Sequence, residues 1–323
     1  MIVKPDPSFL PPLPLPAPIV LANGRHIVSE EQRVSMKTLY EQHGLSTWKI
    51  GKLFGYKNVC IINNLKKMGV SLRNRSDANK TIEVNRLYFK QIDTHTKAYL
   101  LGLIYADGNV CKDSFTLALQ EPDKPLLEKI AIEIGYKGLL RFRKRQKPNR
   151  QDIWVLRVHD REFCESLRKL GVVDRKTSKL NFPYFLDPIF YWSFLHGLLD
   201  GDGCVCIYKR CDGSSILTGS IAGSPFIIPQ IAQFVKSTLG VHLTATKRKG
   251  TNGWCCTANC MSALKFLSYI FKDAKNFCLK RKFLKFQEAV EHYSHHNRFD
   301  KFKVLVQNVS NQYLNEASCS FAV

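Results

Sequence analysis

Two stretches of the chain repeat one pattern of apolar, small and acidic positions. They read Leu-Leu-Gly-Leu-Ile-Tyr-Ala-Asp-Gly at 100–108 and Leu-His-Gly-Leu-Leu-Asp-Gly-Asp-Gly at 195–203, 95 positions further along the chain. The third and seventh residues of each copy are small, and residues four apart lie on one face of a helix. Small residues at this spacing allow two helix backbones to approach closely. The pattern predicts two helices that pack together about a pseudo-two-fold axis, each ending at an acid.

After each of these segments the apolar periodicity predicts the same series of elements: two strands, a helix, two strands and a helix. In the first half the expected elements are two strands within 109–120, a helix at 125–135, a hairpin formed by 139–146 and 152–159, and a helix at 161–170. In the second half they are strands within 204–222, a helix at 229–240, a hairpin within 241–258 and a helix at 261–271. The sequence therefore predicts an α+β fold of two αββαββα repeats, at 84–180 and 181–290.

Residues 29–80 form a separate helical pattern, with helices expected at 30–40, 48–54 and 57–68. Gly51, Gly55 and Ile61 have the spacing of a small residue, a turn glycine and an apolar position in a helix-turn-helix, and the segment resembles accessory units of that kind in DNA-binding proteins. A plain helical bundle is the alternative. Residues 1–28 are expected to be a Pro-rich lead-in, and residues 291–323 a tail.

Positive charge dominates the composition. The chain has 48 Lys and Arg against 27 Asp and Glu, which gives a net charge of +21, and nucleic acid is the polyanion that such an excess most often matches. Strand alternation places basic side chains together in the predicted hairpins. The residues expected to contact DNA are Arg141, Arg143, Arg145, Lys147, Arg157, Tyr208, Lys209, Arg210, Lys247, Arg248 and Lys249 in the hairpins, with Lys57, Asn58, Arg73 and Arg75 in the N-terminal unit.

The spacing of the cysteines and the hydropathy of the chain indicate the kind of compartment in which the protein works. The eleven cysteines include no pair with CxxC spacing, which argues against both a disulfide framework and a zinc knuckle. No apolar run approaches the length of a membrane span. These features predict a protein of a reducing, DNA-containing compartment, such as a bacterial or phage-infected cytoplasm or an organelle, with no membrane partner.

The two acids, Asp107 and Asp202, are expected where their helices end, each before a glycine suited to a left-handed helix cap. A carboxylate there faces the negative end of the helix dipole, which costs about 0.3–1 kcal/mol. Two such carboxylates side by side also repel each other unless a cation intervenes. Oxygen ligands favour a hard divalent cation, and Mg2+ in particular binds phosphate oxygens as well.

The paired segments resemble the LAGLIDADG motif of homing endonucleases and related maturases, in the form with two motifs in one chain. The resemblance covers about 84–290, and it departs from the common pattern at Tyr105 and His196. It implies a saddle of two antiparallel sheets on a long, specific double-stranded DNA target. It also implies a monomer and site-specific phosphodiester hydrolysis with Mg2+ or another divalent cation such as Mn2+, as in intron homing.

The same resemblance assigns roles to particular residues. Asp107 and Asp202, with the main-chain carbonyls of Ala106 and Gly201, would hold the metal, while Lys176 and Lys280 would stabilise developing charge. Gln120 is a candidate to orient the nucleophilic water. A nucleic-acid-binding protein without cleavage activity, either an intron maturase that binds RNA or a transcription regulator, remains the alternative.

Overall fold

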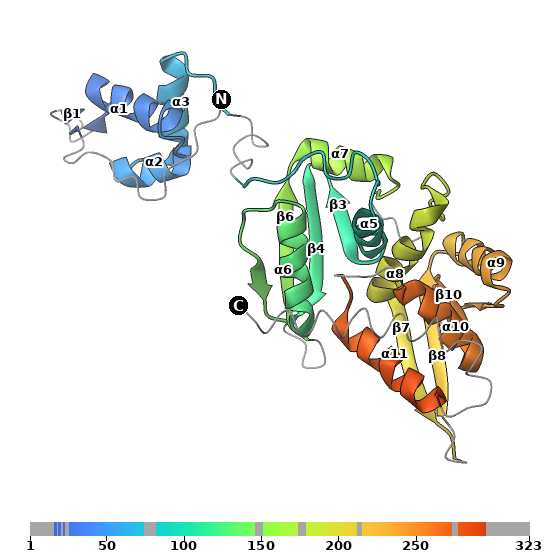
Figure 1. Cartoon of the computed structure of the whole chain (residues 1–323). Helices are drawn as coiled ribbons and strands as arrows, with labels where there is room; N and C mark the ends of the chain where they lie inside the picture. The colour runs from blue at the N-terminus through green and yellow to red at the C-terminus, as the bar shows by residue number, and fades with distance from the viewer. Residues whose placement is uncertain are drawn as a thin grey trace, which may run out of the picture. The chain divides into compact units, whose positions relative to one another are not determined.

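The structure is a computed structural model, and it describes residues 16–17, 19–20, 22, 26–73, 82–145, 151–173, 179–211, 215–272 and 277–294. The chain divides into two compact units, Met1–Thr81 and Ile82–Val323 (Figure 1). Most of the expected lead-in and tail therefore lies outside the described residues. Within the described ranges, no helix combines the length and the apolar character that crossing a membrane requires.

The first unit contains the three expected helices. Its elements are β1 (Ile19–Val20), β2 (His26–Ile27), α1 (Glu30–Glu41), α2 (Thr47–Phe54) and α3 (Asn58–Lys67). Ser29 and Gln32 form a reciprocal capping box at the start of α1, and the Ser46 side chain caps α2. Such caps satisfy backbone N–H groups that the first helical turn leaves without partners.

The turn between α2 and α3 has the geometry that its glycines predict. Gly55 ends α2 in the left-handed conformation, with φ of 72°. A Cβ on Gly51 would lie only 2.6 Å from the Tyr56 carbonyl oxygen, so a larger residue would push the turn away from α2. Ile61 of α3 is fully buried, in a core separate from that of the second unit.

The second unit has the expected class, α+β with two αββαββα repeats. The first repeat consists of α5 (His95–Asp107), β3 (Gly108–Cys111), β4 (Ser114–Gln120), α6 (Lys124–Glu133), β5 (Arg141–Arg143), β6 (Ile153–His159) and α7 (Arg161–Lys169). The second consists of α8 (Tyr191–Asp202), β7 (Gly203–Lys209), β8 (Ser215–Gly223), α9 (Ile227–Leu239), β9 (Thr244–Lys247), β10 (Trp254–Asn259) and α10 (Cys260–Phe271), followed by α11 (Lys280–Tyr293). Short 3-10 turns at Glu121–Asp123 and Pro188–Phe190 lead into α6 and α8.

The two sheets have the same topology. Their strand orders are β3-β4-β6-β5 and β7-β8-β10-β9, antiparallel throughout. One face of each sheet is covered by its helices. In the first repeat Phe115 of β4 meets Phe163 of α7, with ring centroids 5.5 Å apart, and in the second Gly219 of β8 faces Leu267 of α10. Among the described residues, no helix packs on the opposite face of the sheet in its own repeat. This face is called here the open face.

Candidate active site and nucleic-acid interface

The motif helices α5 and α8 lie side by side at the centre of the second unit (Figure 1). A Cβ on Gly102 would overlap the Phe194 carbonyl oxygen and lie 2.9 Å from the Leu198 amide nitrogen. A Cβ on Gly197 would overlap the corresponding carbonyl of Tyr99. The two backbones are thus in direct contact at equivalent points, which confirms the predicted packing about a pseudo-two-fold axis. This contact between α5 and α8 is called here the seam.

The seam brings the acidic end of one helix against the other. Asp107 and Asp202 are the last residues of α5 and α8, and both side chains are exposed. A Cβ added to Gly201 would overlap the Ala106 methyl group and lie 3.2 Å from Oδ2 of Asp107. The smallness of the seventh motif position therefore lets the Asp107 carboxylate approach the backbone that carries Asp202.

The glycines after the two acids serve a different purpose from the one expected. Gly108 and Gly203 are extended, with φ of −73° and −99°, so the prediction of left-handed caps is wrong. Each glycine is instead the first residue of a strand, folded tightly against its helix. A Cβ on Gly108 would lie 2.7 Å from the Ile104 carbonyl oxygen. Glycine is needed here for the close approach, which sends the chain directly from the acid into the sheet.

A cleft of about 570 Å³ opens beside Asp107. Gln120, Ala118 and Ile153 line it from the first sheet, and Arg145 lines it from the chain just after β5. The second repeat contributes Asp200, Gly201, Leu279 and Arg281, and Asp123 and Gln151 complete the lining together with Leu119. The structure therefore brings the predicted Gln120 into the same cleft as the predicted metal ligand Asp107.

Arg281 is a cleft residue that the sequence did not single out. Its Nε lies 3.3 Å from both carboxylate oxygens of Asp123, which is almost fully buried, while about half of the Arg281 side chain remains exposed. The pair links α11 of the second repeat to the start of α6 in the first. Guanidinium groups can bind phosphate and carboxylate through several N–H donors, and Arg281 brings such a group into the cleft that Asp107 also lines.

Lys282 is buried at the end of α8. Its Nζ donates hydrogen bonds to the carbonyl oxygens of Leu199 (2.7 Å), Asp200 (2.6 Å) and Gly203 (2.7 Å). An ammonium group has three donors, so all of them are used on backbone that the helix end would leave without partners. Burial lowers the pKa of Lys282, and the nearby carboxylates of Asp200 and Asp107 oppose that shift. Lys282 thereby fixes the helix end that presents Asp202. Its partners do not include the carbonyl of Gly201, which is one of the predicted metal ligands.

We expect Lys282→Met to lower the free energy of unfolding by about 1–3 kcal/mol for each buried carbonyl that loses its partner and finds no water. Denaturant unfolding measures this loss. Lys280→Met is the matched control, because Lys280 is exposed on the first turn of the same helix, and its stability should change by less than about 0.5 kcal/mol. Equal stabilities of the two variants would contradict the anchoring role of Lys282.

Asp200 and His196 form a buried polar group inside the seam. Oδ2 of Asp200 accepts hydrogen bonds from the Tyr99 hydroxyl and the Leu279 backbone amide, each 2.8 Å long. Burial raises the pKa of Asp200 to about 6 and lowers that of His196 to about 3. His196 packs edge-on against Tyr99 and Phe271, which explains how the motif accommodates an imidazole at this position.

Tyr105 stands at the motif position equivalent to Asp200. Its hydroxyl donates to the Leu170 carbonyl, 2.5 Å away, just after α7, whereas Asp200 accepts from Leu279 in the segment that leads to α11. Burial raises the pKa of Tyr105 above its usual range, so the phenol remains a hydrogen-bond donor. Tyr105 therefore keeps a hydrogen bond between its motif helix and the end of its repeat, as Asp200 does. The direction differs, because Tyr105 donates this hydrogen bond and Asp200 accepts it.

The first sheet presents arginines on its open face. Arg141 and Arg143 of β5 pair with Val155 and Ile153 of β6, so they share a face with Arg157. Arg157 in turn lies beside Thr116, with Nε 3.5 Å from Oγ1. Burial, Arg157 and Arg141 all lower the pKa of His159 on the same face, which reflects a positive local potential. Gln120 lies on this face as well, at the end where the sheet meets the cleft.

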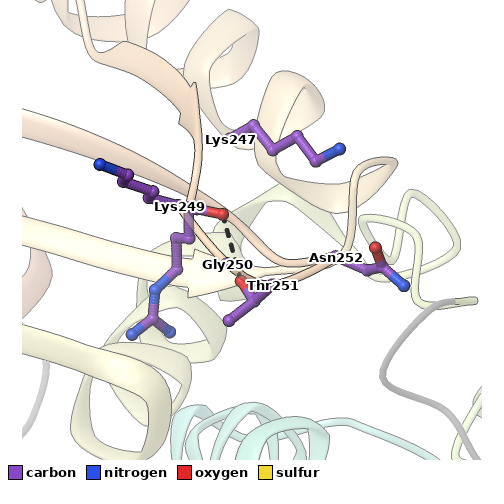
Figure 2. A pocket seen from close by; sticks show the side chains of 6 residues that line it. Lys247, Lys249, Gly250, Thr251 and Asn252 are labelled. Atoms are coloured by element: carbon purple, nitrogen blue, oxygen red, sulfur yellow. Dashed lines mark hydrogen bonds between the residues drawn. The ribbon is translucent and has the colours of Figure 1, made fainter.

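The basic residues of the second repeat lie at hairpin ends. Lys209 is the last residue of β7, Arg210 follows it, and both are exposed. Lys247, Arg248 and Lys249 line a shallow pocket in the β9–β10 hairpin together with Gly250, Thr251 and Asn252 (Figure 2). The Thr251 hydroxyl donates to the Arg248 carbonyl over 3.4 Å, which closes the tip. Strand pairing turns Lys247 towards the helix-covered side, opposite Trp254.

Other expected contact residues have varied positions. Lys57 and Asn58 are exposed at the start of α3. Arg73 is engaged within the first unit, because its guanidinium donates to the carbonyls of Tyr40, Gly44 and Leu45 and stacks on the Tyr40 ring. That guanidinium therefore supports the fold of its own unit. Arg75, Lys147 and Lys176 lie outside the described residues.

The donor set at the helix ends suits a hard divalent cation. Asp107 and Asp202 are exposed at the helix ends, and the backbone of Gly201 lies against Ala106 and the Asp107 carboxylate. Among the residues that the structure describes, no three His, Cys, Asp or Glu side chains gather into a closed metal site. Carboxylate and carbonyl oxygens are the ligand types that hard divalent cations take.

Comparison with known proteins gives structural similarities only. No protein-family model matches the sequence, and no curated protein matches it either. Three similar solved structures are LAGLIDADG homing endonucleases. I-SmaMI, bound to cleaved DNA, has 14% identity and a TM-score of 0.41, covering 65% of this chain and 95% of that one.

I-LtrWI, bound to target DNA, has 14% identity and a TM-score of 0.38, covering 71% of this chain and 98% of that one. I-GzeII, in complex with its DNA target, has 14% identity and a TM-score of 0.39, with coverage of 65% and 97%.

Proposed function

We propose that this chain is a site-specific double-strand DNA endonuclease of the homing type, which hydrolyses phosphodiester bonds with a divalent metal. The observation that carries the proposal is the seam. Two helices in backbone contact each end at an exposed aspartate, and the Asp107 carboxylate lies against the end of the other helix. The net charge of +21 and the arginines on the open face of the first sheet support a polyanionic substrate.

Each residue of the site has a part in the proposed reaction. Asp107 and Asp202, with the carbonyls of Ala106 and Gly201, would hold Mg2+ or Mn2+. A metal held by these oxygens would supply an acidified water as nucleophile and stabilise charge on the leaving oxygen. Within the same cleft the Gln120 amide orients a water, and Arg281 donates to a phosphate oxygen. Lys282 is a positioning residue, because its three hydrogen bonds hold the end of α8 and thereby the backbone that carries Asp202.

Cleavage of a plasmid library with Mg2+ tests the proposal. The library carries randomised duplex sites, and the products are sequenced at the cut ends. Recovery of one related set of sites with both strands cut supports the endonuclease. Selective binding of duplex DNA or intron RNA with no cut in either Mg2+ or Mn2+ would favour the maturase or regulator alternative.

We further propose that residues 29–80 form an accessory DNA-binding unit of the helix-turn-helix type. The tight turn at Gly51 and Gly55, the buried Ile61 and the exposed Lys57 and Asn58 support this assignment. None of the proposed metal ligands belongs to the unit. Its core is also separate from that of the second unit, so the second unit has its own basis for stability.

Deletion of residues 1–80 is expected to leave the cut positions unchanged and to weaken binding. Each phosphate contact removed should flatten the slope of log affinity against log salt by about 0.9. Footprinting and gel-shift titrations at several salt concentrations measure both effects. A footprint of unchanged length would mean that this unit does not touch DNA, and the plain helical bundle would then be the better description.

A further inference from the structure

The two open faces differ in chemistry, although the two sheets share one topology. In the first sheet the open face is set by β4, whose buried residues Phe115, Leu117 and Leu119 face the helices. Its alternate residues and their strand partners therefore point the other way. The side chains of this open face are Asn109, Cys111, Ser114, Thr116, Ala118, Gln120, Arg141, Arg143, Ile153, Val155, Arg157 and His159.

In the second sheet the same reasoning starts from Leu217, Gly219 and Ile221, the buried positions of β8. The open face then consists of Cys204, Cys206, Tyr208, Ile216, Thr218, Ser220, Ala222, Thr244, Thr246, Cys255, Thr257 and Asn259. All of these strand positions lie within the described residues, and they include no Lys or Arg. Within its strands the second open face therefore has no charged side chain, and the guanidinium of Arg248 lies one residue beyond β9. The first open face carries three guanidinium groups within its strands.

Contacts between side chains confirm these assignments in the second sheet. The Thr218 hydroxyl donates to the Asn259 side-chain carbonyl across β8 and β10, 2.9 Å apart. Thr246 and Cys255 meet across β9 and β10 at 3.4 Å, and the sulfur atoms of Cys204 and Cys206 are 2.9 Å apart along β7. Each of these pairs joins residues of one face, as the strand pairing requires. Hydroxyl, amide and thiol groups thus lie together on this face of the sheet.

Groups of these two kinds read DNA differently. Arginine makes bidentate hydrogen bonds to guanine in the major groove, while asparagine pairs in the same way with adenine and threonine contacts the thymine methyl group. In the second repeat the basic residues Lys209, Arg210, Lys247, Arg248 and Lys249 are at strand ends and hairpin tips. That position suits phosphate contacts, which hold the register of the protein without reading bases.

We propose that the repeats read their halves of the target by different chemistry: the first selects guanine through Arg141, Arg143 and Arg157, and the second selects A·T pairs through the uncharged strand residues of its open face. This proposal rests on the proposed DNA-binding function and concerns the substrate class of that same site. The target is therefore asymmetric in composition, with its guanine contacts concentrated on one side of the cut.

Site selection with the full-length chain tests this division. The protein is incubated in Ca2+ with a duplex library of random sequence, and bound duplexes are sequenced, for the parent and three variants. We expect Arg157→Ala to remove a guanine preference in one half-site, with a loss of about 5- to 150-fold in affinity for the parent's selected duplex. Asn259→Ala should relax an A·T preference in the other half-site only. Arg161→Ala is the matched control, because it removes an exposed guanidinium from α7 on the helix-covered side.

The possible outcomes distinguish the division of base recognition between the repeats from the proposed site-specific DNA binding. Enrichment of guanine in both halves, or loss of preference in the same half for Arg157→Ala and Asn259→Ala, would overturn the division of labour while leaving DNA recognition intact. An Arg161→Ala effect equal to that of Arg157→Ala would also overturn it, since the open face would then have no special role. Failure of the parent protein to enrich any sequence would instead count against site-specific DNA binding itself.

Discussion

Asp107→Asn and Asp202→Asn are each expected to abolish double-strand cleavage while changing DNA affinity by less than about tenfold, or ~1.4 kcal/mol. The amide keeps the size of the carboxylate but removes the negative charge that would hold a divalent cation. Each acid ends its own seam helix, so each should serve one strand, and loss of either one interrupts the double-strand cut. Gel-shift affinity and plasmid cleavage, measured on the same preparations, test both halves of the expectation.

Nicking of supercoiled plasmid adds a sharper readout. A single variant that still cuts one strand would produce open circles without linear product, and the double variant should produce neither. Glu128→Gln is the control, because it also neutralises one acid but lies exposed on α6, where it pairs with Lys124. Full linearisation by either Asp variant would remove that residue from the metal site.

Sequence alone was enough to predict the parts of the fold that depend on local pattern. The small residues of the motif, including Gly102 and Gly197, recur four apart, and helical geometry places such residues on one face whatever surrounds them. The open-face position of Arg141, Arg143 and Arg157 likewise follows from strand alternation and from the pairing of β5 with β6. These features require only the period of the element and the order of the elements along the chain.

Which basic side chain at the start of α11 is buried depends on distant parts of the chain, and the sequence alone could not predict it. Lys280, Arg281 and Lys282 are consecutive basic residues, and nothing in their spacing says which side chain enters the core. The start of α11 separates them: Lys280 is exposed, Arg281 reaches Asp123, and Lys282 binds the Leu199 carbonyl of α8, 83 residues earlier in the chain. A rotation of about 100° per residue separates these three directions.

Gly108 and Gly203 show a different limit. Glycine after a helix is compatible both with a left-handed cap and with close packing, and the two possibilities look identical in the sequence. The structure selects the second because each strand begins directly at the glycine and lies back on the last turn of the helix. The requirement for glycine is therefore steric at both positions.

Gly102→Ala and Gly197→Ala are expected to destabilise the second unit, because one methyl group at either position overlaps backbone atoms of the facing helix. Backbone cannot rotate away as a side chain can, so α5 and α8 must separate. Overpacking of this kind costs about 1–3 kcal/mol and occasionally more, and for a unit of this size each kcal/mol lowers Tm by about 2–4 °C. Thermal unfolding measures the shift. Cleavage should also fall, because separating the helices moves the two acids apart.

Gly253→Ala is the matched control for the seam variants. A Cβ there would meet nothing closer than the Thr251 hydroxyl at 3.6 Å, so the same chemical change should leave Tm nearly constant. A helix-propensity gain of up to ~1 kcal/mol works in favour of Gly102→Ala and Gly197→Ala, which makes a net loss of stability all the more specific to the contact between the helices. Parental Tm values in both seam variants would show that the backbones do not meet at these glycines, and the shared presentation of Asp107 and Asp202 would lose its structural basis.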